Sequence, residues 1–394
     1  MKKIMKKIMI ITPGFMPVPD VIGGAVESLI TYILEQNEEE ANYEIALYTI
    51  FNRKIDRTKF TYTYIKQYKR TILKKIVDHT RLLFKKKMKY TYKDFVLKEI
   101  TKKGDKYDYI LVENNIILLN DILNNCSNEL IHKIIYHLHN DVDTLEYTQS
   151  NLRKVVKNNI PIICVSQYVA NRVRTLCEYN NVYILRNAID FSQFDYNLYD
   201  KTNGISNNIV ITYAGRLAEY KGVLELIQAF TCLCDKGYKN IKLNIIGSYN
   251  NLNGKDDLYT IKVKKAAKGY DVNFVGFIPH SLIYRNLIYS DIVIVPSICM
   301  EAAPLTIIEA QAAKNAVIAT KHGGIPEYQE DNSCLYINED HGLKNGIEEA
   351  LEYLLKNKHD IDSLKNKGYI NASKYTKKIY YQDFNKIIHE IGEK

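Results

Sequence analysis

Short, almost continuous apolar runs recur along the chain, and a segment with helical periodicity follows most of them. The runs that predict strands cover residues 7–12, 44–50, 109–112, 133–138 and 161–165 in the first half, and 209–214, 242–246, 272–275, 292–296 and 316–319 in the second. Strands that are apolar on both faces must be covered on both faces, as in the parallel sheets of α/β proteins. The pattern therefore predicts an α/β fold with parallel sheets between layers of helices.

The length of 394 residues suits two such domains better than one. Residues 190–208 are rich in Asn, Asp, Gln and Ser and have no strong hydrophobic period, which indicates a linker. We therefore expect two Rossmann-like domains, 1–190 and 191–374, followed by an amphipathic helix in 375–394. Ligands of such sheets bind beyond the carboxyl ends of the strands, so two facing sheets would enclose a cleft there.

Cysteine usage and hydropathy favour a cytoplasmic protein. The seven cysteines form no CxxC pair, and several lie in apolar runs, as reduced thiols do. The first residues have a basic flank, but their short apolar run leads into Pro13-Gly14 without a cleavage site, which predicts a first strand and not a signal peptide. No run reaches the ~20 apolar residues that cross a bilayer, so membrane association would be peripheral.

The net charge of +9 comes from one region. Residues 51–106 hold nineteen Lys and Arg against five Asp and Glu, a local charge of +14 that leaves −5 for the rest. Within 66–90, apolar and basic residues interleave as in an amphipathic helix on anionic lipid. A solvated helix with one face in the core is the alternative. No nucleic-acid-binding motif accompanies the charge, so a nucleic-acid partner is not expected.

A glycine-bounded loop follows the predicted strand 209–214. It runs Gly215-Arg216-Leu217-Ala218-Glu219-Tyr220-Lys221-Gly222 and leads into a helix. Glycine lets the backbone approach a phosphate, a helix start offers unpaired N–H groups, and two cations are at hand. The loop is a candidate diphosphate clamp, and a plain solvated loop is the alternative.

Two glutamates follow the predicted strand 292–296. Pro304 suits a loop or a first helical turn, so Glu301 is expected in the loop and Glu309 on the following helix. A carboxylate accepts hydrogen bonds from paired sugar hydroxyls. Two glutamates at this spacing are weak evidence by themselves.

Together these motifs resemble the retaining GT-B glycosyltransferases of family 4, in order and in spacing. Further matches are Pro296-Ser297, Gly323-Gly324-Ile325-Pro326-Glu327, Gly23-Gly24, Ser166, Asn187-Ala188-Ile189-Asp190, Gly247 and Gly276. The resemblance covers nearly the whole chain and is weaker in 51–130. The chain departs from it at Ala302-Ala303-Pro304-Leu305, where many members have a glycine and an aromatic residue, so the donor sugar cannot be taken from better-known relatives.

The resemblance implies the roles of the site residues. Arg216 and Lys221 would contact the diphosphate, Glu309 the ribose, and Glu301 the donor sugar. Gly24 would approach the phosphates across the cleft. The implied donor site comprises Gly23, Gly24, Gly215, Arg216, Lys221, Gly247, Ala303, Pro304, Leu305 and Glu309, and the implied catalytic side chains are Arg216, Lys221, Glu301 and His139. Family members typically need no divalent metal, so no cofactor is expected.

His137-Leu138-His139 closes the predicted strand 133–138, and strand alternation places both imidazoles on one face. In family members a histidine at this strand end lies near the donor sugar, and His139 is the closer match. A packed or surface histidine is the alternative. Metal binding by the pair is disfavoured because no cysteine or carboxylate cluster stands nearby in the sequence. His322 beside Gly323 is a weaker candidate.

The resulting expectation is a retaining hexosyltransferase. It would use a nucleotide diphosphate sugar, with a UDP-sugar favoured, and a glycan or lipid-linked acceptor in bacterial surface polysaccharide synthesis, at the inner face of the cell membrane. The domain 1–190 would bind the acceptor and 191–374 the donor, and the helix in 375–394 would return to the first domain. The alternatives are a nucleotide-sugar epimerase of the same fold and a non-catalytic module that binds membranes or polyanions.

Overall fold

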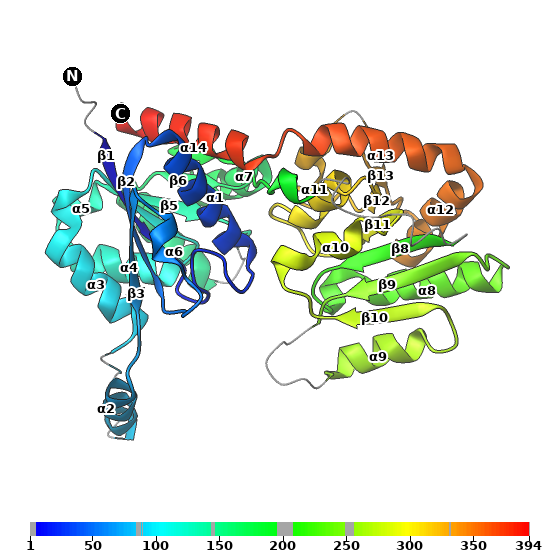
Figure 1. Cartoon of the computed structure of the whole chain (residues 1–394), viewed down its shortest axis with the longest axis horizontal. Coiled ribbons are helices and arrows are strands. Elements are labelled where there is room, and N and C mark those ends of the chain that lie inside the picture. Colours follow the sequence, from blue (N-terminus) through cyan, green and yellow to red (C-terminus); the bar gives the residue numbers. More distant parts are fainter. Residues whose placement is uncertain are drawn as a thin grey trace. The chain divides into compact units, whose positions relative to one another are not determined.

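The computed structural model describes residues 5–83, 88, 90–142, 146–194, 208–248, 256–330 and 332–393. The chain forms two compact units: residues 1–186 with 380–394, and residues 187–379. Each unit is a parallel sheet with helices packed around it (Figure 1). The predicted linker 190–208 lies mostly outside the described residues, which stop at 194 and resume at 208.

The first unit contains a seven-stranded parallel sheet in the order β3-β2-β1-β4-β5-β6-β7. The strands are β1 (Lys6–Ile11), β2 (Tyr43–Ile50), β3 (Thr63–Tyr68), β4 (Tyr109–Glu113), β5 (Ile134–Leu138), β6 (Ile162–Cys164) and β7 (Val182–Ile184). The order reverses direction at β1, with β2 on one side and β4 on the other. This is the doubly wound topology in which ligands bind at the carboxyl edge. The sequence pattern missed β3 and β7, the two edge strands.

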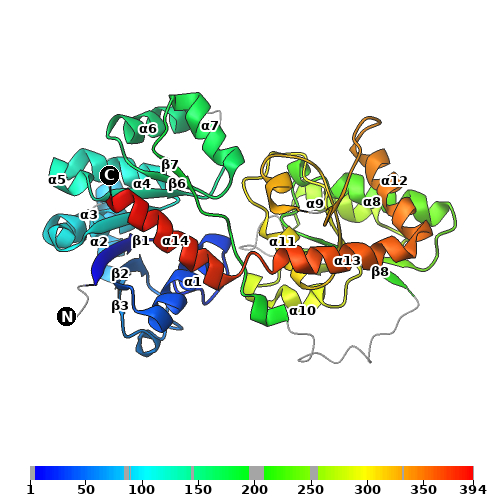
Figure 2. The same ribbon diagram turned by 90° about the horizontal axis from the view of Figure 1, so that it is seen from above.

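The helices of the first unit, apart from α2, cover both faces of the sheet. The helices are α1 (Ala25–Glu40), α2 (Ile72–Leu83), α3 (Tyr92–Lys103), α4 (Ile116–Asn125), α5 (Asn128–Ile131), α6 (Glu146–Lys157) and α7 (Gln167–Cys177). The C-terminal helix α14 (Lys377–Gly392) lies across this unit beside α1 (Figure 2). Its Tyr381 hydroxyl donates to Asn37 Oδ1 at 2.7 Å, and Phe384 packs edge-on against Tyr43. The last fifteen residues therefore complete the core of the first unit.

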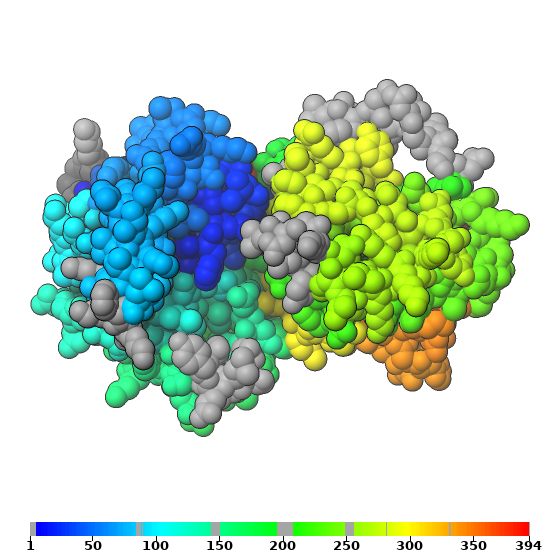
Figure 3. All heavy atoms as spheres, turned by 90° about the horizontal axis from the view of Figure 1, so that it is seen from below, coloured from blue at the N-terminus to red at the C-terminus, as the bar shows by residue number. Residues whose placement is uncertain are grey.

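Helix α2 projects from the rest of the first unit, beyond the end of β3 (Figure 1). Its large apolar side chains are 41–77% exposed, namely Ile72, Leu73, Ile76, Val77, Leu82 and Leu83. Asp78 is its buried residue, paired with Arg70 at 2.8 Å. Figure 3 shows the light-blue helix at the surface facing the reader.

The predicted amphipathic helix is confirmed for its described residues, and its alternative, an apolar face in the core, is wrong. Residues 84–87 and 89 of the predicted segment lie outside the described residues.

The second unit contains a six-stranded parallel sheet in the order β10-β9-β8-β11-β12-β13. The strands are β8 (Ile209–Ala214), β9 (Ile241–Ile246), β10 (Val272–Gly276), β11 (Ile292–Val295), β12 (Ala316–Ala319) and β13 (Leu335–Tyr336). The helices are α8 (Val223–Asp235), α9 (Leu258–Ala266), α10 (Tyr284–Leu287), α11 (Leu305–Ala312), α12 (Leu343–Lys356) and α13 (Lys358–Ala372). Ile292 and Ile294 join one apolar cluster, and Val293 and Val295 join another. The sheet is thus buried on both faces, as the continuous apolar runs predicted.

None of the described helices is both long and apolar enough to cross a membrane. The seven cysteines all lie in described segments, and each is a free thiol. Cys164 and Cys334 are buried, where burial raises the pKa of the Cys164 thiol to about 12. These thiols pack as small apolar groups.

Candidate functional site

Loops that follow neighbouring strands of the second unit meet at the carboxyl edge of its sheet. A Cβ on Gly247, after β9, would lie 1.9 Å from the carbonyl oxygen of Gly215, after β8. A Cβ on Gly222 would lie 2.1 Å from the Pro296 carbonyl oxygen, and one on Gly323 would lie 2.2 Å from that of Glu301. Gly222, Gly247 and Gly323 also have positive φ angles. Only glycine satisfies both conditions, so these glycines bring the loop backbones into direct contact.

The loop after β8 presents two cations at this edge. Arg216 is exposed, and its Nη1 donates to the Tyr220 hydroxyl at 2.9 Å. A short 3₁₀ helix, Glu219–Lys221, then places Lys221 directly before α8. The predicted order of strand, glycine-bounded loop and helix is confirmed. The role of the loop in binding phosphate stays a prediction.

Lys221 reaches across to the loop after β11. Its Nζ lies 2.5 Å from Glu301 Oε1, and the Ser297 hydroxyl donates to the same oxygen. The Lys221 and Glu301 side chains are 22% and 14% exposed. The pair is therefore mostly buried but still in contact with solvent, and a ligand that arrives at this edge can compete for either partner.

Glu301 lies in the loop and Glu309 on α11, as predicted. Pro304 occupies the position just before the first residue of α11. Glu309 is buried, and its Oε1 lies 2.6 Å from His280 Nε2. The sequence interpretation missed His280. The sequence feature that could have identified His280 is its position in the loop after the predicted strand 272–275, at the same edge of the sheet.

The residues between the two glutamates hold the loop to the rest of the second unit. Asn187 Nδ2 donates to the Ala303 carbonyl oxygen at 3.2 Å, and the Asn187 backbone N–H donates to the Tyr328 hydroxyl at 2.8 Å. Pro304 and Leu305 are buried. This segment opens helix α11, where the first backbone N–H groups have no partner within the helix and suit an anionic ligand.

His322 contacts two other loops of the same edge. Its Nδ1 lies 2.7 Å from the Ser297 carbonyl oxygen, and its Nε2 lies 2.9 Å from Glu339 Oε2. Both ring nitrogens are thus engaged with the protein. The geometry favours a packing role for His322 over contact with a ligand.

The remaining predicted residues, Gly23, Gly24 and His139, belong to the first unit. Gly23 and Gly24 have φ angles of 103° and 139°, and α1 begins at the next residue. The Gly23 N–H donates to Asp20 Oδ1 at 2.6 Å, which fixes the turn. The predicted glycine pair before an N-terminal helix is confirmed, and its contact with phosphate stays a prediction.

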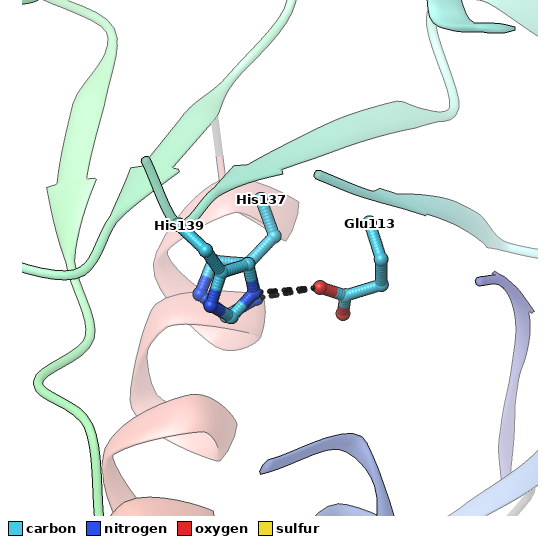
Figure 4. A group of neighbouring side chains, drawn as sticks. All are labelled: Glu113, His137 and His139. Carbon is cyan, nitrogen blue, oxygen red and sulfur yellow. Dashed lines mark hydrogen bonds and ion pairs between the residues drawn. The ribbon is translucent and has the colours of Figure 1, made fainter. Parts of the chain in front are cut away.

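His139 belongs to a buried cluster of three side chains at the ends of β4 and β5 (Figure 4). His139 Nε2 lies 2.9 Å from Glu113 Oε2, and His137 Nδ1 lies 3.1 Å from the same oxygen. The His137 contact is not aligned for a hydrogen bond. The two imidazole centroids are 3.9 Å apart, which confirms that both rings share a face of the strand.

Burial and mutual interaction set the charges of this cluster. Burial by itself raises the pKa of Glu113, but interactions with His137 and His139 outweigh it and lower the pKa to about 2. Burial, with the electrostatic effect of His137, lowers the pKa of His139 to about 4 against the opposing effect of Glu113. At neutral pH, Glu113 is therefore a carboxylate and His139 a neutral imidazole.

Glu113, His137 and His139 offer three ligand atoms within 4.8 Å of one another, the one such group of metal-binding residue types among the described residues. The sequence argument that no carboxylate accompanies the histidine pair is therefore wrong. Glu113 is 24 residues before His137 in the chain but directly opposite it in the parallel register of β4 and β5. A carboxylate at the end of the preceding strand was the signal that could have revealed it.

Residues 196–372 match the model of the family described as glycosyl transferases group 1. The chain is 31% identical over 211 residues to the lipopolysaccharide 1,2-N-acetylglucosaminetransferase of Salmonella typhimurium, covering 52% of this chain and 53% of that protein. It is 36% identical over 106 residues to the capsular polysaccharide biosynthesis glycosyltransferase CapM of Staphylococcus aureus, covering 24% and 28%. The chain thus spans about half the length of the first relative and less of the second.

Solved structures match over the whole length. Anabaena HepE in complex with UDP and glucose has a TM-score of 0.71 at 16% identity, with 98% of this chain and 100% of that chain covered. A glycosyltransferase from Rickettsia africae has a TM-score of 0.72 at 15% identity, with 99% of each chain covered. These likenesses show the fold, which is GT-B with two Rossmann-like units. Residues 196–372, nearly all of the second unit, thus match the glycosyl transferases group 1 family within a chain of the GT-B fold.

Proposed function

We propose that the chain is a retaining hexosyltransferase that moves a sugar from a UDP-sugar to a glycan or lipid-linked acceptor in bacterial surface polysaccharide synthesis. The Lys221–Glu301 pair at 2.5 Å, with Arg216 on the same loop as Lys221 and bonded to Tyr220, is the observation that carries the proposal. It sets a cation and a hydroxyl-binding carboxylate side by side at a ligand-binding edge. The similarity to transferases of lipopolysaccharide and capsule synthesis, and the UDP bound in HepE, support the substrate classes.

The proposed reaction needs charge stabilisation more than it needs a nucleophile. The bond between the anomeric carbon and the phosphate oxygen breaks with its electron pair on the phosphate, and the sugar becomes oxocarbenium-like. The acceptor hydroxyl oxygen bonds the anomeric carbon from the same face, and its proton passes to the departing phosphate. Arg216 and Lys221 stabilise the phosphate charge, so this transfer requires no divalent metal.

The other site residues have proposed positions around the donor. Glu309 binds the ribose hydroxyls, held in place by His280. The backbone N–H groups of 303–305 face the diphosphate or the sugar, while Gly215 and Gly247 let the backbone approach it. Gly23 and Gly24 serve the phosphates from the first unit, and His139 serves the transferred sugar.

Nucleotide release tests the transferase proposal. The purified protein is incubated with UDP-glucose, UDP-galactose or UDP-N-acetylglucosamine and with lipid-linked glycan acceptors, and UDP is measured. We expect release with one donor that depends on acceptor, and an anomeric configuration in the product equal to that of the donor by NMR. No release with any donor and acceptor, or isomerisation of the sugar nucleotide without transfer, would overturn the proposal, the latter in favour of an epimerase.

Helix α2 favours a membrane-bound acceptor. Six large apolar side chains on it are 41–77% exposed, and Lys74, Lys75 and Arg81 lie among them on the same helix. An amphipathic helix of this kind binds anionic bilayers through its apolar face and its cations together. The proposed location is therefore the inner face of the cell membrane, with contact through residues 66–90.

Vesicle flotation tests this contact. The protein is expected to float with vesicles that contain phosphatidylglycerol and to remain free with phosphatidylcholine alone. Leu73→Glu with Leu83→Glu should reduce binding at least ~10-fold, because each large side chain contributes about 1.5–3 kcal/mol on full burial. The control is Leu258→Glu with Ile370→Glu, two exposed apolar residues of the second unit. Equal binding to both vesicle types, or equal loss in the control, would reject the docking surface.

A further inference from the structure

Strand register brings Glu113, His137 and His139 together. In the parallel pair β4 and β5, Glu113 is directly opposite His137, and His139 follows two residues later on the same face. These strands are central in the seven-stranded sheet, and the cluster lies at their carboxyl ends. The His139 backbone N–H also donates to Asn114 Oδ1 at 3.0 Å. The backbone of His139 is therefore tied to Asn114, directly after β4, and its imidazole to Glu113, the last residue of β4.

The carboxylate of Glu113 determines which ring nitrogen of His139 carries the proton. An ionised carboxylate accepts hydrogen bonds and donates none, so at 2.9 Å the His139 Nε2 must carry the proton. A neutral imidazole has one N–H and one lone pair, which leaves the lone pair on Nδ1. Glu113 thus selects one of the two tautomers of His139.

The selected lone pair has no protein partner within the described part of the chain. An unpaired acceptor in a buried position lowers stability unless a ligand satisfies it. His139 is 8% exposed, whereas His137 is 1% and Glu113 0% exposed, so His139 is the least buried member of the cluster, although its Nδ1 atom is itself buried. Its neutral ring offers a lone pair to a ligand hydroxyl group that enters beside it, and it offers no charge to a phosphate.

We infer that Glu113 is a positioning residue that fixes His139 as the Nε2–H tautomer, so that Nδ1 accepts a hydrogen bond from a hydroxyl group of the sugar substrate. This inference rests on the proposed transferase function, and it assigns the chemistry by which His139 serves the sugar. The ring of His137, tilted by 45° with its centroid 3.9 Å away, limits the rotation of the His139 ring on the other side.

A metal ion is the competing occupant of the same three side chains. Two imidazoles bound to one tetrahedral ion through ~2.0–2.1 Å bonds hold their ring centres roughly 5 Å apart. The observed centroid distance is 3.9 Å. The rings would have to separate to hold an ion, whereas the hydrogen bond to Glu113 is already formed.

The tautomer can be measured without any activity. Long-range proton–nitrogen NMR of protein labelled with ¹⁵N-histidine distinguishes a protonated ring nitrogen from a lone-pair nitrogen, and the chain has only nine histidines. His139→Gln assigns the signals of His139. We expect the Nε2–H form in the native protein and a mixture of tautomers in Glu113→Gln, because an amide can donate or accept. Glu113→Leu, which removes the acceptor, should show the same mixture.

Two results would overturn the inference at this stage. One is a His139 that has the other tautomer in the native protein, or that keeps Nε2–H in both Glu113 variants. The other is stoichiometric zinc in the purified protein by elemental analysis, lost on treatment with a chelator and absent in Glu113→Gln, since Nε2 would then be a metal ligand. Neither result depends on whether the protein is a transferase.

Kinetics then test the connection to the substrate. Glu113→Gln is expected to lower kcat/KM about 10- to 100-fold, the effect of an imperfect hydrogen bond at a buried partner. In a His139→Phe background the same substitution should cause no further loss, because Glu113 acts through His139. The control is Glu99→Gln, which changes a buried glutamate that pairs with Lys66 in the same unit, and its effect should add to that of His139→Phe.

Additive losses for Glu113 and His139 would assign Glu113 a general structural role and reject the inference. A native protein without transferase activity but with the predicted tautomer would reject the proposed function alone.

Discussion

Both units set a carboxylate against nitrogen-containing side chains at or just beyond the carboxyl ends of parallel strands, but only the cluster of the first unit is sealed from solvent. Glu113 and His137 are 0% and 1% exposed, whereas the Lys221 and Glu301 side chains are 22% and 14% exposed. In a sealed cluster the low dielectric makes each interaction strong and fixes the protonation states. In the open pair of Lys221 and Glu301, which keeps contact with solvent, water and ligands compete with the partner. The sealed cluster suits fixed orientation, and the open pair suits exchange with an anionic ligand.

The difference follows from where the residues lie in the fold. Glu113 and His137 are still within their strands, paired in register and covered by helices. Lys221 and Glu301 lie in loops after their strands, held by glycines at close backbone contacts. The strand end thus gives a rigid site, and the loop beyond it gives an accessible one.

The largest expected effect is a loss of turnover when the Lys221–Glu301 pair is broken. Lys221→Met should lower turnover about 10²–10³-fold, the typical effect of one electrostatic donor at a leaving group. It should change the free energy of unfolding by about 1 kcal/mol, since both side chains of the pair keep contact with solvent and the Ser297 hydroxyl still donates to Glu301. UDP release and urea unfolding measure the two quantities.

Lys236→Met is the matched control for this substitution. Lys236 pairs with Glu348 and Glu352 in the same unit, away from the strand ends, and its side chain is 49% exposed. Its turnover should equal that of the native protein. A Lys221→Met protein with native turnover, or one that loses turnover only because it unfolds, would remove Lys221 from the diphosphate site.

The sequence predicted the buried strands and the loop motifs well because both depend on local patterns. Strands β8 and β12 have the predicted bounds, and Glu301, Glu309 and the glycine turns lie in the predicted elements. The three missed strands, β3, β7 and β13, are all at sheet edges. Edge strands are short or partly exposed, so they lack a continuous apolar run, as in the sequence TYIKQY of β3.

The missed site contacts are all long-range. Glu113 meets His137 through strand register, His280 meets Glu309 across 29 residues, and Lys221 meets Glu301 across 80. Each residue type was visible in the sequence, but its partner depends on which strands are neighbours. The order of strands in a parallel sheet is not a local property, so a single sequence predicts the residues of a site better than their pairing.

The second-largest expected effect is a loss of stability at low pH, caused by the sealed cluster of Glu113, His137 and His139. The pKa of His139 is about 4 in the folded protein against an ordinary 6.5, so between pH 6.5 and 4 the unfolded chain binds a proton that the folded protein does not. Stability therefore falls as the pH falls through this window, by on the order of 3 kcal/mol at 1.36 kcal/mol per pKa unit. The lowered pKa of Glu113, about 2 against 4.5, extends the loss in the same direction between pH 4.5 and 2.

Urea unfolding followed by circular dichroism between pH 7 and 4 measures this effect. His139→Gln should flatten the dependence of the unfolding midpoint on pH in the upper window, since it removes the titrating group. His359→Gln, which removes a 79% exposed imidazole, is the control for loss of a surface histidine. The same slope in native protein and His139→Gln would show that His139 is not held neutral by burial, and the contrast between the two clusters would fail.

The smallest effect is the stability cost of breaking the open pair. Glu301→Gln should change the free energy of unfolding by about 1 kcal/mol or less, because the amide still accepts from Ser297 and Lys221 can turn to water. Glu113→Gln, the same substitution in the sealed cluster, should cost about 1–3 kcal/mol, since no water compensates its lost interactions with the two histidines. Urea unfolding of both variants at pH 7 gives the comparison directly. If Glu301→Gln proves as costly as Glu113→Gln, the Lys221–Glu301 pair is a structural ion pair, and a diphosphate could not exchange with it at low cost.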